Sequence, residues 1–61
     1  MKLKEYLDKN GISITLFSVK TGISVPTLYR IIRGEWCSWR TATIIIKSTQ
    51  EQVGIEDLEV K

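Results

Sequence analysis

The side chains of this chain that could do chemistry are arginines and hydroxyl-bearing residues between positions 24 and 40. Arg30, Arg33 and Arg40 follow one another closely there, and Tyr29 stands beside the first of them. A guanidinium presents a rigid fork of N–H donors that matches a phosphate or the O6 and N7 atoms of guanine. These residue types therefore favour recognition of a polyanion.

The residues that make or break covalent bonds are absent or isolated. The sequence has no histidine and one cysteine, Cys37, so an intrachain disulfide, a zinc site and a Cys-His catalytic site are all excluded. The acidic residues do not form a paired-carboxylate motif. We expect no enzyme, no metal and no cofactor. Cys37 is either a bystander thiol, which we favour, or a redox sensor whose pKa is lowered by a helix N-terminus and Arg40.

The length of 61 residues fits one domain, residues 1–61. The longest apolar run, residues 44–46, is far too short to cross a membrane, and the N-terminal residues lack a signal-peptide apolar stretch. A single cysteine fits a reducing cytosol. We therefore expect a cytoplasmic protein without a membrane partner, and no small-molecule ligand.

The charge of the chain is unevenly distributed. Residues 13–47 carry five basic residues and one acidic residue, a net charge of +4, whereas residues 48–61 have a net charge of −3. The whole chain has a net charge of +2. A polyanion partner for the central part is consistent with this modest basic patch.

Periodicity and capping signals predict short helices that would position these side chains. Residues 2–9 have helical apolar spacing and stop at Asn10-Gly11. Ser13 has the position of an N-cap for a helix to about Thr21, with Ile12 and Phe17 as a hydrophobic staple. Gly22 suits the left-handed turn that follows.

The same signals recur in the second half. Ser24 caps a helix that carries Pro26 in its first turn and ends at Gly34. Ser38 caps a fourth helix from Trp39 to about residue 49, although its β-branched residues would also suit a strand. Residues 55–58 could add one helical turn.

Together these segments predict an all-α, compact four- to five-helix domain with a helix-turn-helix at about residues 13–34 and a C-terminal tail at about 50–61. We expect the following side chains to be packed in its core: Phe17, Leu28, Ile31, Ile32, Trp36, Trp39 and Ala42.

One stretch resembles a known family. Gly22-Ile23-Ser24, the residues from Pro26 to Ile31, and Arg33-Gly34 resemble the helix-turn-helix of the Cro and phage lambda-repressor family, and the resemblance continues from Ser38 to Leu58. It implies the lambda-repressor-like fold and a sequence-specific, double-stranded DNA-binding transcriptional regulator, a Cro-like repressor from a phage or mobile element.

The chain departs from that family at a few positions. Ile14 stands where many members have a glutamine that braces the phosphate backbone, Ser18 replaces an alanine, and Thr21 replaces a leucine. Ile44 and Ile46 stand where members tend to have charged residues, which suggests an apolar interface on the fourth helix.

The resemblance and the residue types together give candidate DNA contacts. The base-reading candidates are Val25, Pro26, Tyr29 and Arg30. The phosphate-contacting candidates are Thr15, Ser24, Thr27, Arg33, Ser38 and Arg40. For the hydroxyls of Ser24 and Thr27, the competing interpretation is capping of the helix. For Tyr29, it is an exposed side chain that packs along its own helix without contacting DNA.

The sequence also predicts a surface for a protein partner. One short helix reads few base pairs, so a homodimer is expected, at least on DNA. Its candidate surface comprises Ile44, Ile46, Ile55 and Leu58, unless the tail packs on its own core. The alternative function is a protein-interaction module, an antitoxin or adaptor that keeps the helix-turn-helix fold.

Overall fold

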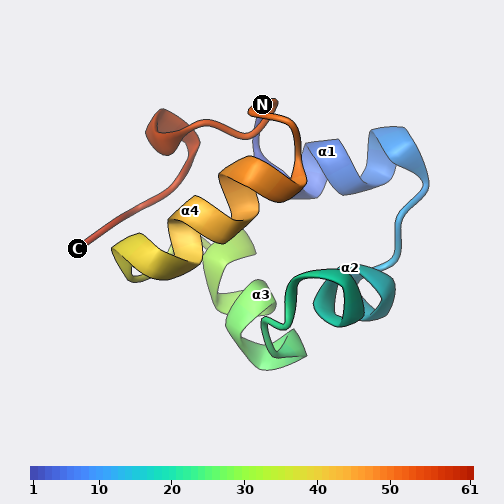
Figure 1. Cartoon of the computed structure of the whole chain (residues 1–61), viewed down its shortest axis with the longest axis horizontal. Coiled ribbons are helices and arrows are strands. Elements are labelled where there is room, and N and C mark those ends of the chain that lie inside the picture. Colours follow the sequence, from blue (N-terminus) through green and yellow to red (C-terminus); the bar gives the residue numbers. More distant parts are fainter.

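Four short α-helices and a final 3-10 turn make up the protein (Figure 1). The computed structural model describes residues 1–61. The helices are α1 (Leu3–Asn10), α2 (Ile14–Thr21), α3 (Val25–Ile32) and α4 (Trp39–Ser48), and the 3-10 turn is η1 (Ile55–Asp57). The all-α prediction is confirmed. The β-branched segment 41–46 is helical because the Ser38 cap starts a helix there and the chain offers it no partner strand.

Serine caps begin three of the four helices. In each case the serine Oγ accepts a hydrogen bond from the backbone N–H three residues on: Leu16 to Ser13 at 3.0 Å, Thr27 to Ser24 at 3.4 Å and Thr41 to Ser38 at 3.2 Å. Each cap satisfies one of the N–H groups that a helix N-terminus leaves without an internal partner. The capping signals in the sequence therefore predicted these helix starts correctly.

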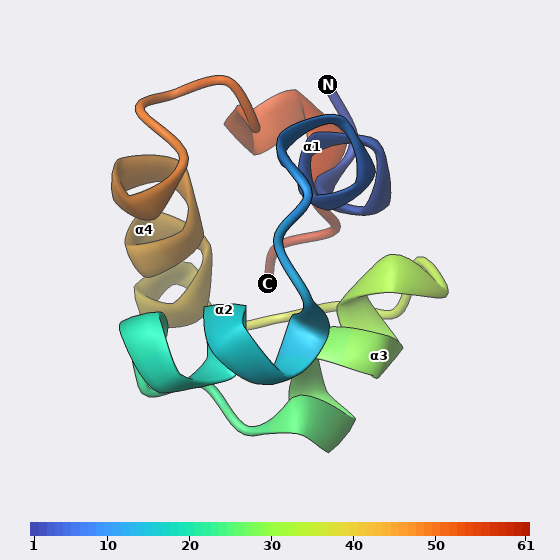
Figure 2. The same cartoon turned by 90° about the vertical axis from the view of Figure 1, so that its right-hand side faces the viewer.

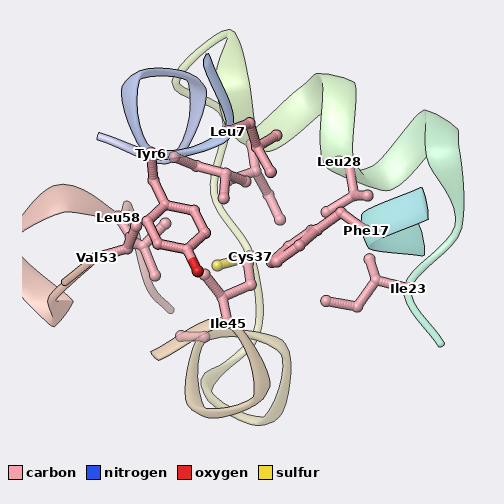
Figure 3. Packing of buried hydrophobic residues seen from close by; sticks show 12 residues of the cluster. Tyr6, Leu7, Phe17, Ile23, Leu28, Cys37, Ile45, Val53 and Leu58 are labelled. Carbon is pink, nitrogen blue, oxygen red and sulfur yellow. The ribbon is translucent and has the colours of Figure 1, made fainter. Parts of the chain in front are cut away.

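The core lies between the helices and the C-terminal segment (Figures 1 and 2). Its buried apolar residues are Leu3, Tyr6, Leu7, Phe17, Ile23, Leu28, Ile31, Cys37, Ala42, Ile45, Val53 and Leu58. Figure 3 shows them converging from every helix and from the tail. Phe17, Leu28, Ile31 and Ala42 lie where they were predicted, and Ile32 is half-buried against the same cluster.

The two tryptophans are not in this core, so that prediction was wrong. Trp36 is 59% exposed and Trp39 is 64% exposed. Cys37 makes an isolated parallel β-bridge, and neighbours in extended backbone point to opposite sides. The smaller Cys37 therefore takes the core position while Trp36 faces solvent. Trp39 continues the stripe of Ala42 and Ile45, but its side chain is largely exposed whereas theirs are fully buried.

The C-terminal segment is fastened to the rest of the fold by apolar and polar contacts. Val53 and Leu58 are buried in the core. Thr49, fully buried, donates its hydroxyl to the carbonyl of Ile45 at 2.9 Å and accepts the N–H of Val53 at 3.3 Å. The segment therefore folds back on its own helices, as Figure 2 also shows.

Asp57 links this segment to the start of the chain. Its Oδ2 accepts hydrogen bonds from the backbone N–H of Gly54 at 3.1 Å and from the Met1 ammonium group at 3.0 Å. The ammonium group also donates to the carbonyl of Gln52 at 2.6 Å. The hydrogen bond from Gly54, and next the one from the ammonium group, hold the pKa of Asp57 below its ordinary value.

We expect the core to be far more sensitive to truncation than the exposed tryptophans. Leu28→Ala should cost about 2–5 kcal/mol because it opens a cavity where no surface is exposed. That is much of the stability of so small a domain. Trp39→Ala, the control, should change the free energy of unfolding by less than about 1 kcal/mol. Urea denaturation measures both, and equal losses would contradict this core.

The Asp57 contacts predict an acid-sensitive term in stability. Because the folded pKa lies below the unfolded value of about 4, the contribution is complete above that value. It is lost as the pH falls through the folded pKa. Thermal melting over a pH series should show a shallower acid loss for Asp57→Asn than for the wild type. Glu59→Gln, which alters an exposed carboxylate, should keep the wild-type slope.

Candidate nucleic-acid interface

The turn between α2 and α3 is closed by three hydrogen bonds as well as by a glycine. Gly22 has φ +76°, in the left-handed region that favours glycine. Ser18 Oγ donates to the carbonyl of Ile23 at 2.6 Å. Thr21 Oγ1 donates to the carbonyl of Phe17 at 2.8 Å and accepts the N–H of Ile23 at 3.2 Å. Two of the departures from the family pattern therefore fasten the turn.

One edge of α3 is open to solvent. Pro26, Tyr29 and Arg30 are exposed and Val25 is half-buried, whereas Leu28 on the other side is completely buried. Pro26 lies in the first turn, where its missing N–H costs no hydrogen bond. The four predicted base-reading residues thus belong to one helix whose opposite face is fixed in the core.

The N-terminus of α2 lies on one side of this edge. A shallow hollow there is lined by Lys4, Leu7, Asp8, Ile12, Ser13, Ile14, Tyr29 and Ile32. Tyr29 therefore stands close to the start of α2. The N–H groups of Ile14 and Thr15, the first two of α2, have no partner in the chain, whereas Ser13 caps the N–H of Leu16. The Thr15 side chain is exposed, so its hydroxyl can donate a hydrogen bond to the same acceptor as these N–H groups.

The N-terminus of α4 lies on the other side. A second hollow is lined by Thr27, Arg30, Glu35, Trp36, Cys37, Ser38 and Thr41. Ser38 Oγ donates to Thr41 Oγ1 at 3.1 Å, which leaves the Thr41 hydroxyl proton free to donate. Sequence reasoning missed Thr41 and assigned Trp36 to the core. The repeated spacing Ser24-x-x-Thr27 and Ser38-x-x-Thr41 was the available signal for Thr41.

The three arginines do not form one cluster. Arg30 lines the hollow beside α4, whereas Arg33 lines a different one with residues of α1 and the tail. Arg33 Nη2 also lies 3.0 Å from Glu35 Oε2 in an exposed ion pair, which is worth at most about 1 kcal/mol. Arg40, in the first turn of α4, is exposed and in no ion pair.

Helix caps already use two predicted phosphate ligands. Ser24 Oγ lies 2.8 Å from Thr27 Oγ1 and also accepts the N–H of Thr27. The Ser38 hydroxyl is engaged in the same way with Thr41. The caps leave one hydroxyl proton of each pair for an outside acceptor. Each Ser-Thr pair therefore offers a single outward hydrogen bond.

Cys37 is a core residue and no thiolate is favoured there. Its side chain is 5% exposed, and Figure 3 shows its sulfur among Tyr6, Phe17 and Ile45. Burial raises the pKa of the Cys37 thiol. Desolvation therefore acts against the alternative interpretation, a redox sensor with a lowered pKa, and is consistent with the bystander thiol that we favoured.

The four residues proposed for a partner surface differ in their surroundings. Ile55 is 41% exposed, and Ile44 and Ile46 are half-buried against the core. Leu58 is 9% exposed and belongs to the core, which favours packing of the tail on its own domain. The most exposed apolar side chain is instead Val19, on α2, at 78%.

No group of three or more histidine, cysteine, aspartate or glutamate side chains is arranged to hold a metal ion. None of the helices combines the length and the apolar character that a membrane crossing needs.

Comparison with known proteins identifies a family. The family model described as Cro/C1-type HTH DNA-binding domain matches residues 2–58, which is nearly the whole chain. Searches of curated proteins and of solved structures give no significant match. The match includes all four helices and η1, so it covers the turn and both hollows around α3.

The fastened turn gives a testable stability difference. Thr21→Val leaves the N–H of Ile23 without its acceptor and should cost about 1–3 kcal/mol. Thr43→Val is the matched control, because the Thr43 hydroxyl bonds only the Trp39 carbonyl of its own helix, and its cost should be below about 1 kcal/mol. Chemical denaturation measures both, and equal costs would mean that Thr21 does not fasten the turn.

Proposed function

The chain belongs to the Cro/C1-type HTH DNA-binding domain family, and from this we propose that it is a sequence-specific transcriptional regulator that reads the major groove of double-stranded DNA with α3. The observation that carries the proposal is the arrangement around α3. Its exposed edge lies between the N-termini of α2 and α4, whose free N–H groups suit phosphates on either side of a groove.

We assign the base contacts to the exposed edge of α3. Arg30 is the principal one, because its guanidinium can donate two hydrogen bonds to a guanine and takes part in no ion pair within the protein. Val25 and Pro26 suit contact with a thymine methyl group, and Tyr29 suits a base or phosphate. All four stand on a helix whose other face is fixed in the core.

Phosphate contacts follow on both sides of the helix. They are assigned to Thr15 beside the start of α2, Ser24 and Thr27 at the start of α3, and Ser38 and Arg40 at the start of α4. Arg33 would have to leave or share Glu35, so its contribution is smaller. A phosphate at the start of α4 would also meet the free hydroxyl of Thr41.

Regulation by this protein would require no chemistry. We propose that it is a cytoplasmic, Cro-like repressor of a phage or mobile element. It would block a promoter by occupying it. Two copies that bind half-sites one helical turn apart would read about twice as many base pairs as one copy. Ile44, Ile46 and Ile55 are the exposed or half-buried residues that we propose for contact between copies.

A second function is favoured by a different observation. Leu16, Val19, Trp36 and Trp39 are large apolar side chains with between 46% and 78% of their surface exposed. Where exposed apolar side chains adjoin one another, they form the kind of patch that marks a protein-binding surface. An antitoxin or adaptor that binds a polypeptide would use them, and such a module would bind no duplex even at low salt.

The two arginines predict separable effects on DNA binding. The preferred duplex is first selected from a random pool. Arg30→Ala should then weaken the free energy of binding to that duplex by about 1–3 kcal/mol, and to mixed sequences by much less. Arg40→Ala should weaken binding to both kinds of duplex by a similar factor, because phosphates carry no sequence information.

Fluorescence anisotropy titrations of the selected and mixed duplexes measure these effects. If both variants lose the same factor on every sequence, Arg30 does not read a base. Absence of duplex binding by the wild-type protein at low salt contradicts the regulator and leaves the polypeptide-binding function.

A further inference from the structure

The last residues of the chain lie against the loop that follows α3. The N–H of Cys37 donates to the carbonyl of Glu59 at 2.7 Å, and the N–H of Lys61 donates to the carbonyl of Cys37 at 3.1 Å. These two bonds form the parallel bridge between Cys37 and Val60. In Figure 1 the C-terminal end accordingly lies beside the start of α4. The tail thus brings a cation to the α4 side of the proposed DNA-binding surface.

That cation is the ammonium group of Lys61, and an aromatic ring holds it. Lys61 Nζ lies over the Trp36 ring, 5.5 Å from its centroid, within the range of a cation–π interaction. Trp36 lines the same hollow as Arg30, Ser38 and Thr41. Lys61 does not itself line this hollow, whose lining also includes Glu35, but the Trp36 ring restrains its ammonium group beside it.

The ammonium group remains available to an anion in this position. Lys61 takes part in no ion pair, and an ammonium group has three N–H donors, of which a ring face uses only some. A lysine acts as a point charge and lacks the planar fork that distinguishes bases. Its chemistry in this place suits a phosphate oxygen.

We propose that Lys61, restrained by Trp36, is a further phosphate contact of the DNA-binding surface. The proposal rests on the proposed function, since it adds a contact to that same surface. The segment 48–61 is acidic overall, yet Lys61 lies on the α4 side of the proposed DNA-binding surface. Trp36 is a positioning residue, because it acts through Lys61.

The test is the salt dependence of binding to a fluorescein-labelled, mixed-sequence duplex of about 20 base pairs, because nonspecific binding measures the phosphate contacts. Loss of one contact should reduce the slope of log K against log salt by about 0.9. Lys61→Gln should show this reduction and Lys61→Arg should keep the wild-type slope. Trp36→Ala should change the slope in the same direction as Lys61→Gln, because the ammonium group loses its restraint.

Lys47→Gln is the matched control. It removes the same charge from an exposed lysine in no ion pair, at the other end of α4, and should keep the wild-type slope. Circular dichroism melting should show that each variant is folded, since Lys61, Trp36 and Lys47 are all exposed.

The outcomes separate this inference from the proposed function. Wild-type binding with equal slopes for Lys61→Gln and Lys47→Gln overturns the phosphate contact alone. A wild-type slope for Trp36→Ala overturns the positioning role of the ring. No duplex binding by the wild-type protein at low salt overturns the contact and the proposed function together.

Discussion

The longest helix of this protein has ten residues, and helices of that length are marginal in water without tertiary contacts. Twelve buried apolar side chains supply those contacts, with no disulfide or metal to support them. Local hydrogen bonds at the helix ends therefore add stability that this small core needs. Ser13, Ser24 and Ser38 provide the N-terminal caps, and Ser18 and Thr21 close the turn. The fold depends on this combination of a small core and well-made ends.

The same caps leave open the N–H groups to which we assign phosphate contacts. A serine cap satisfies the third N–H of a helix and leaves the first ones without partners in the chain. In α2 and α4 these free groups lie on the two sides of the exposed edge of α3. The core holds that arrangement through Phe17, Leu28 and Ala42, which join the helices. In the proposed function, stability and recognition therefore depend on the same helix termini.

Local signals explain which parts of the fold were predictable from the sequence. Caps, staples and the left-handed glycine act within a few residues, so the four helices and the turn were predicted closely. The positions of Trp36, Trp39 and Cys37 depend on what the C-terminal segment covers, and no pattern within the loop reveals that. Ser18 and Thr21 depart from the family pattern, and the sequence alone did not indicate the hydrogen bonds that they make at the turn.

Net charge alone understates how basic the α4 side of the molecule is. Three ion pairs join Asp57 to the N-terminal ammonium group, Asp8 to Lys4, and Glu35 to Arg33. None of them uses Arg30, Arg40 or Lys61. A phosphate approaching the start of α4 would therefore meet cations that have no carboxylate partner. Because a bound phosphate need not displace such a partner, these cations contribute more of their Coulomb attraction than Arg33 does. The sequence carries their charge, but only the fold shows that they are unpaired.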